Sequence, residues 1–92
     1  MSTESIIKTL EIKNQMGLHA RPAAMLVQAV SGLTCEVSIE KEGTKVDGKS
    51  IMGVMMLAAE CGSTITVCSE GPDALKAVEE IERIVSTNLG EK

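Results

Sequence analysis

Apolar and polar residues alternate along several short segments of the chain. The clearest is 34–41, where Cys35, Val37 and Ile39 alternate with polar side chains. A period of two predicts a β-strand with one buried face and one face in water. The residues at 42–43, Glu-Gly, then favour a turn into a partner strand. Less regular alternation predicts three more strands, at 5–13, 44–47 and 63–70.

Apolar residues three or four places apart predict helices in three other segments, 21–32, 50–62 and 71–90. The first has Pro22 in its opening turn and Gly32 at its end, and the last opens at Pro72 and Asp73. The expected buried faces are Ala23, Leu26, Val27 and Val30 in the first helix, and Ala74, Val78, Ile81 and Val85 in the last.

The resulting order is β-α-β-β-α-β-α. Strands with one apolar face and amphipathic helices predict an antiparallel or mixed sheet that helices cover on one side only. We therefore expect a two-layer α+β sandwich. The 92 residues suit one domain spanning 1–92. Because the chain contains no Phe, Tyr or Trp, its core must be aliphatic.

The composition excludes several classes of function. A net charge of −4 and the lack of aromatic residues argue against nucleic-acid binding. No apolar run is long enough to span a membrane, and the first residues do not resemble a signal peptide, so we expect a cytoplasmic protein. Three cysteines without CxxC spacing favour reduced, mostly buried thiols over a disulfide framework or metal site. No cofactor is indicated.

The segment 50–62 is too apolar for all of its side chains to face one sheet. If Val54, Leu57 and Ala58 point inward, the remaining apolar side chains are at least partly exposed, namely Ile51, Met52, Met55 and Met56. On its own helix, Met25 points away from the buried stripe. Such an apolar cluster indicates either a docking surface or deeper packing of this helix, and the pattern leaves both open.

His19 is the only histidine, and it stands directly before the helix that Arg21 and Pro22 open. The first N–H groups of a helix lack intrahelical partners, and the positive end of the dipole favours an anion. The same dipole disfavours the imidazolium form, which leaves a neutral, nucleophilic ring. With the Arg21 guanidinium nearby, this is suitable chemistry for a phosphorylated histidine. A surface or capping histidine is the alternative.

Residues 43–50, GTKVDGKS, fit the phosphate-binding pattern G-x-x-x-x-G-K-[ST]. Lys45 and Val46 alternate as in a strand, and the chain lacks the repeated βαβ units of nucleotide-binding sheets. We therefore interpret the match as accidental. In the alternative that we favour, Ser50 is the N-cap of the second helix. A phosphate on Ser50 would oppose docking at the apolar side chains beside it.

Two motifs together resemble the HPr family, the histidine-containing phosphocarriers of the bacterial phosphoenolpyruvate-dependent sugar phosphotransferase system. They are GLHARPAA at 17–24 and KSIMGVM at 49–55, and the resemblance extends over essentially the whole chain. It implies an open-faced sandwich, in which three helices cover one face of a four-stranded antiparallel sheet. It also implies a stoichiometric phosphoryl carrier rather than an independent catalyst.

The resemblance further implies that Nδ1 of His19 accepts phosphate from Enzyme I and passes it to sugar-specific IIA domains. Arg21 would neutralise the phosphate, and the N–H groups of Ala20 and Arg21 would help to hold it. Ser50 matches a serine that, in some bacteria, a dedicated HPr kinase/phosphorylase modifies, with a transcriptional regulator as a further partner. The implied docking residues are Met25, Ile51, Met52 and Met55.

One departure from the family pattern is Met16, which stands where Asn or Thr is frequent. Three other functions stay open. One is a regulatory HPr paralogue in carbon or nitrogen control, and another is a small nucleotide-binding protein that uses residues 43–50. The third is a structural interaction module built on the Met-rich helix. Weak, transient contacts with partners favour a monomer.

Overall fold

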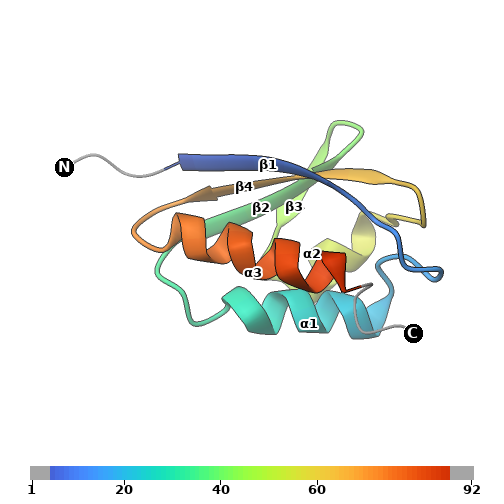
Figure 1. Cartoon of the computed structure of the whole chain (residues 1–92), viewed down its shortest axis with the longest axis horizontal. Helices are drawn as coiled ribbons and strands as arrows, with labels where there is room; N and C mark the ends of the chain where they lie inside the picture. Colours follow the sequence, from blue (N-terminus) through green and yellow to red (C-terminus); the bar gives the residue numbers. More distant parts are fainter. Residues whose placement is uncertain (1–4, 88–92) are drawn as a thin grey trace.

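The computed structural model describes residues 5–87, and within them four strands and three helices form two layers. In chain order they are β1 (Ser5–Glu11), α1 (Ala20–Val30), β2 (Glu36–Lys41), β3 (Thr44–Asp47), α2 (Ile51–Met56), β4 (Thr64–Glu70) and α3 (Ala74–Ser86). Figure 1 shows the helices together on one side of the sheet, whose other face is open. The predicted α+β open-faced sandwich is confirmed.

All neighbouring strands are antiparallel, in the order β1-β4-β2-β3. The predicted hairpin joins β2 and β3, with Ile39 opposite Val46. Ile39 also lies opposite Val67 of β4, so apolar side chains from adjacent strands meet on the helical face. Burying each such side chain contributes about 1.5–3 kcal/mol, which pins the register of the sheet.

The core is aliphatic throughout, as the composition requires. The expected inner faces of α1 and α3 are both buried. Ala23, Ala74 and Ala77 are fully inaccessible. Small side chains at these positions let the helices lie close to their neighbours, which compensates for the lack of large aromatic groups.

Strand β1 is the irregular edge of the sheet. Ile6 and Leu10 pack against the core, whereas Ile7 is 67% exposed on the open face. Lys8 alternates with Ile7 and therefore lies on the helical side. At this edge its ammonium reaches Glu82 of α3, at 3.0 Å. The edge position explains why a lysine interrupts the apolar pattern of the strand.

Helix α2 is shorter than the sequence predicts, because it ends at Met56 rather than near residue 62. Val54 and Leu57 are buried as expected, but the inward orientation predicted for Ala58 is wrong. Ala58 is exposed and adopts a left-handed conformation with φ of 51°. Its carbonyl accepts a hydrogen bond from Lys41 Nζ at 3.2 Å, and the chain leaves the helix there.

The three cysteines are free thiols, and the prediction that they are mostly buried is wrong. Cys35 and Cys68 are half-buried and Cys61 is exposed. Cys68 lies opposite Ser38 on the open face of the sheet, and Cys61 belongs to the loop before β4. Neither position is covered by a helix, and the number and spacing of the cysteines do not reveal this.

Asp73 joins the start of α3 to the loop before β2. Its Oδ2 accepts a hydrogen bond from the backbone N–H of Thr34 at 2.7 Å. The Asp73 N–H in turn donates to the Thr34 carbonyl at 3.1 Å. The carboxylate thus connects the loop before α3 to the loop before β2, and it does not cap α3 with its side chain. Pro72 and Asp73 precede the helix, which begins at Ala74.

We predict that Asp73→Ala lowers the free energy of unfolding by about 1–2 kcal/mol, because a hydrogen bond to a charged acceptor is lost. Urea denaturation measures the change. Asp73→Asn keeps an acceptor oxygen and serves as the matched control, with a smaller loss. Equal losses in the two variants would show that the Thr34 hydrogen bond does not stabilise the fold.

Candidate functional site

His19 is the N-cap residue of α1, in extended conformation with φ of −87° and ψ of −169°. Its carbonyl accepts the first hydrogen bond of the helix, from Ala23 N at 3.0 Å. The side chain does not cap α1 and is half-buried. The imidazole is thus attached immediately beside the free end of the helix, as the sequence predicts.

The N–H groups that a ligand can reach at this end of α1 belong to Ala20 and Arg21. Ala23 already donates to His19, and Pro22 has no N–H. Unpaired donors at a helix start favour an anion. Both residues are exposed, and the Arg21 side chain adds a positive charge. Together with His19 they form a shallow site that is open to water.

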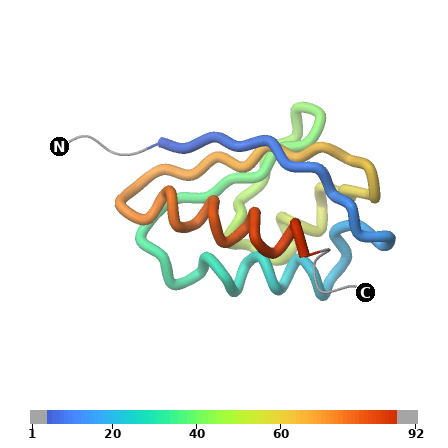
Figure 2. The backbone as a smooth tube through the Cα atoms, viewed as in Figure 1, coloured from blue at the N-terminus to red at the C-terminus, as the bar shows by residue number. Residues whose placement is uncertain are grey.

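The loop before His19 rests on the segment that follows α2. Leu18 N donates to the Ala59 carbonyl at 2.8 Å. Gly17 has φ of 70°, and a Cβ on it would lie 2.4 Å from that same carbonyl oxygen. Only glycine fits here without displacing the backbone. Figure 2 shows the two segments side by side, the loop in blue and the segment after α2 in yellow.

Asn14 lies beneath the same loop and is 1% exposed. Its Nδ2 donates to the Gly17 carbonyl at 2.7 Å. Asn14 is not among the functional residues predicted from the sequence. The available signal was a polar residue three places before a glycine, which is typical of a turn closed by a side chain.

Ser50 is the N-cap of α2, and its predicted capping geometry is present. Its Oγ accepts a hydrogen bond from Gly53 N at 3.1 Å. Helices α1 and α2 pack against one another in the helical layer (Figure 1), so both helix starts belong to the same layer.

An apolar surface is exposed on α2. We call it the α2 patch, and it consists of Ile51, Met52, Met55 and Met56. Met52 and Met56 are the most accessible, at 69% and 74%. Deeper packing of this helix is therefore excluded. Met16, in the loop before His19, is also 69% exposed.

The prediction that Met25 faces water is wrong. Its side chain is half-buried and packs against the core. The helical wheel placed it opposite the buried stripe of α1. A helical wheel takes no account of neighbouring elements, and α1 is flanked by both α2 and α3. Met56 is exposed but was not among the docking residues that the resemblance implied.

The structure argues against the nucleotide-binding alternative for residues 43–50 and supports the interpretation of the motif match as accidental. Residues Thr44–Asp47 form strand β3 and pair with β2, so they cannot wrap around phosphates. Lys49 Nζ donates to the Leu33 carbonyl at 2.7 Å. The lysine therefore ties the connection between β3 and α2 to the loop that follows α1.

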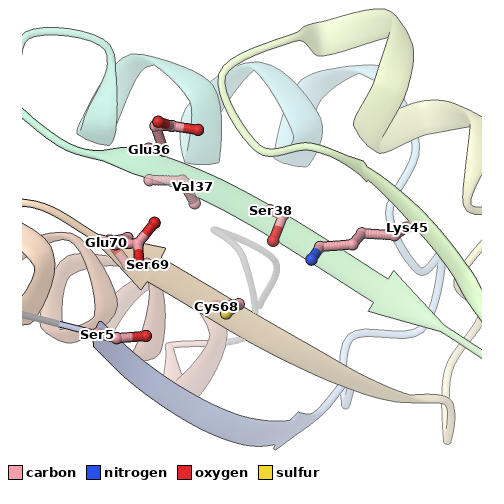
Figure 3. A pocket seen from close by; sticks show the side chains of 8 residues that line it. All are labelled: Ser5, Glu36, Val37, Ser38, Lys45, Cys68, Ser69 and Glu70. Atoms are coloured by element: carbon pink, nitrogen blue, oxygen red, sulfur yellow. The ribbon is translucent and has the colours of Figure 1, made fainter.

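Residues 5–87 contain no group of three or more His, Cys, Asp or Glu side chains placed to hold a metal ion. None of their helices is long and apolar enough to cross a membrane. A hollow of about 330 Å³ lies on the open face of the sheet, lined by β2 and β4 residues and by Ser5 and Lys45 (Figure 3). None of its lining residues belongs to the His19 site.

A family model described as the PTS HPr component phosphorylation site matches residues 6–87. The chain belongs to the HPr family. It is 41% identical over 87 residues to the phosphocarrier protein HPr of Treponema pallidum, covering 95% of this chain and 99% of that protein. It is 51% identical over 74 residues to the HPr-like protein Crh of Halalkalibacterium halodurans, covering 80% and 88%.

The fold agrees with this membership. The crystal structure of HPr-C-His from Thermoanaerobacter tengcongensis has a TM-score of 0.90 and 39% identity, covering 95% of this chain and 98% of that one. The resemblance to HPr seen in the two sequence motifs is confirmed. The chain is a phosphocarrier-family protein of the phosphotransferase system.

We predict that Gly17→Ala destabilises the protein more than Gly43→Ala does. Both glycines have positive φ, but nothing lies within 4 Å of a Cβ at Gly43. Gly43→Ala should cost about 1–2 kcal/mol from backbone strain alone. Gly17→Ala adds the clash with Ala59, about 1–3 kcal/mol more. Denaturant unfolding of both variants measures the difference, and equal losses would contradict the close contact.

Proposed function

We propose that His19 carries a phosphoryl group from phosphorylated Enzyme I to sugar-specific IIA domains. One observation carries this proposal. A half-buried imidazole stands at the start of α1, where only Ala20 and Arg21 offer N–H groups to an anion. A single histidine so placed suits a cytoplasmic, monomeric carrier that needs no cofactor.

In the proposed transfer, the lone pair on Nδ1 of His19 attacks phosphorus, and a nitrogen–phosphorus bond forms. The bond between phosphorus and the donor group of Enzyme I breaks, and the donor keeps its electron pair. Passing the group to a IIA domain repeats the exchange with His19 as the leaving group. The Arg21 guanidinium and the two N–H groups offset the phosphate charge in each step.

The exposure of the site supports reversible transfer. Arg21 is exposed, so its pairing with phosphate is screened by water. A buried cage with many donors would bind the phosphate too strongly for it to leave. The remaining groups that the reaction needs would then come from the partner, which closes over the site when it docks.

We assign docking of Enzyme I and the IIA domains to the α2 patch. Large exposed apolar side chains on one short helix are typical of protein contacts, and methionine adapts to differently shaped partners. One surface could then serve several proteins in turn. Met25 contributes less than expected, because it is half-buried.

Ser50 is proposed as a regulatory phosphorylation site for an HPr kinase/phosphorylase. Its hydroxyl oxygen already accepts from Gly53 N, beside Ile51 and Met52 of the α2 patch. A phosphate there would place about two negative charges next to an apolar contact surface. Docking of Enzyme I would weaken, and a surface for a transcriptional regulator would form.

A regulatory paralogue is the second candidate, favoured by the similarity to the HPr-like protein Crh. In that function Ser50 would be the essential residue and sugar uptake would not depend on the chain. The presence of His19 supports the carrier function over paralogues that lack this histidine. Phosphorylation by Enzyme I distinguishes the two candidates.

We predict that wild-type protein incubated with phosphoenolpyruvate, Mg²⁺ and Enzyme I gains one acid-labile phosphate, detected by intact mass. His19→Ala should gain none while unfolding at nearly the same temperature, because the half-buried ring contributes little to the core. Labelling of the variant would show that a residue other than His19 accepts the phosphate. A folded wild-type protein that stays unlabelled would favour the regulatory paralogue.

We predict that Ser50→Asp raises the KM for this protein in the Enzyme I reaction about tenfold, which corresponds to about 1.4 kcal/mol of docking energy. Ser50→Asn is the matched control, since Asn caps a helix as well as Asp does but carries no charge. Its KM should stay near the wild-type value. Equal KM values for the two variants would contradict an electrostatic effect of Ser50 on docking.

A further inference from the structure

We propose that Asn14 is a positioning residue for phosphoryl transfer. Its buried side-chain amide holds the Gly17 carbonyl and, through it, the backbone that carries His19. The inference rests on the proposed function of His19 and names a residue that acts on the reaction without touching the phosphate.

The amide of Asn14 closes a turn together with its own backbone. Nδ2 donates to the Gly17 carbonyl at 2.7 Å, while Gly17 N donates to the Asn14 carbonyl at 3.2 Å. A carbonyl can only accept, so the NH₂ group must face Gly17 and the amide orientation is fixed. At 1% exposure, Asn14 has little room to adopt another rotamer.

The Gly17 carbonyl has a second donor, the backbone N–H of His19 at 3.0 Å. One oxygen therefore connects Asn14 to the residue that bears the imidazole. Between them, Leu18 N is bound to the Ala59 carbonyl at 2.8 Å. The peptide planes leading into α1 are thus held on one side by Asn14 and on the other by the segment after α2.

This arrangement has a chemical consequence at the start of α1. The N–H groups of Ala20 and Arg21 are rigid parts of the helix, whereas His19 is attached just outside it. The angle between the ring and those N–H groups depends on the His19 backbone, which the Gly17 carbonyl restrains. Displacement of a reacting group by about 1 Å can lower a rate about a hundredfold.

The chemistry of Asn14 also argues for a specific role. A buried aliphatic side chain would fill the same space without any polar group to satisfy. Only a donor can hold the Gly17 carbonyl in place. Leucine has almost the same shape and size as asparagine, but it has no hydrogen-bond donor. A comparison of these two side chains at position 14 therefore separates the effect of packing from the effect of the hydrogen bond to Gly17.

The kinetic test compares Asn14→Ala and Asn14→Leu with two controls. Gln15→Ala alters an exposed neighbour, and Ile39→Val lowers stability in β2, away from the loop. Phosphorylation by Enzyme I is followed well below the unfolding temperature of every variant. Both Asn14 variants should lose about ten- to a hundredfold in kcat, with KM within about twofold because the α2 patch is unchanged. Both controls should keep the wild-type kcat.

Amide hydrogen exchange provides a measurement that needs no Enzyme I. In both Asn14 variants the His19 N–H should exchange at least about tenfold faster than in wild type, while Val67 N–H in β4 is unchanged, as local opening requires. Ile39→Val should not accelerate His19 selectively. Unchanged kcat in folded Asn14 variants, or equal acceleration at His19 and Val67, would overturn the proposal.

The two measurements also separate this inference from the proposed function. If Enzyme I fails to label the wild-type protein, the carrier function is refuted, and the exchange comparison still decides whether Asn14 fixes the backbone at His19. If the wild type is labelled and the Asn14 variants match it in kcat, the carrier function stands and the positioning role is refuted.

Discussion

The sheet can keep water from its aliphatic face only if helices cover that face closely. Ile39, Ile65 and Val67 are fully buried on the helical face, and α3, with the buried alanines Ala74 and Ala77, lies close to β1, β4 and β2. The helices must therefore lie on one layer, with their connecting loops at the two ends of the strands. The start of α1, the loop before it and the segment after α2 meet at one of those ends. The position of His19 thus follows from how the core is covered.

The shape of α2 has a related cause. A helix of six residues presents only a few side chains to the sheet, and Val54 is its fully buried one. Once Val54 and Leu57 complete the core, the methionines of this segment have no interior space left to fill. The fold itself thereby leaves surplus apolar residues on an exposed surface, in the same layer as His19.

The sequence predicted the features that depend on periodicity or on one local motif. Strand β2, the hairpin, the inner stripes of α1 and α3, and Ser50 as a cap all arise from near neighbours in the chain. The predictions for the end of α2 and for the exposure of Met25 were wrong, because both features depend on distant contacts. The segment after α2 is held by the hydrogen bond from Leu18 N to the Ala59 carbonyl, which is distant in sequence. Met25 is half-buried because it packs against the core beside the elements that flank α1.

Much of the candidate site was predictable for the same reason. His19, Ala20, Arg21 and Pro22 are consecutive, and the properties of a helix start bring them together. Asn14 was not predictable in this way. Its importance comes from being buried and from the carbonyl it holds, and neither is visible in a pattern of polar residues.

The pairing of β1 with β4 has a consequence for how the protein is made. Ser5 lies opposite Glu70, so the central β4 strand can join β1 only after most of the chain has been synthesised. Contacts so distant in sequence form slowly, because a long loop must close first. Ala59, whose carbonyl accepts the hydrogen bond of Leu18 N, is also distant from the loop before His19 in the sequence. The backbone at His19 is therefore completed only after the chain has been made well past α1, to the residues that follow α2.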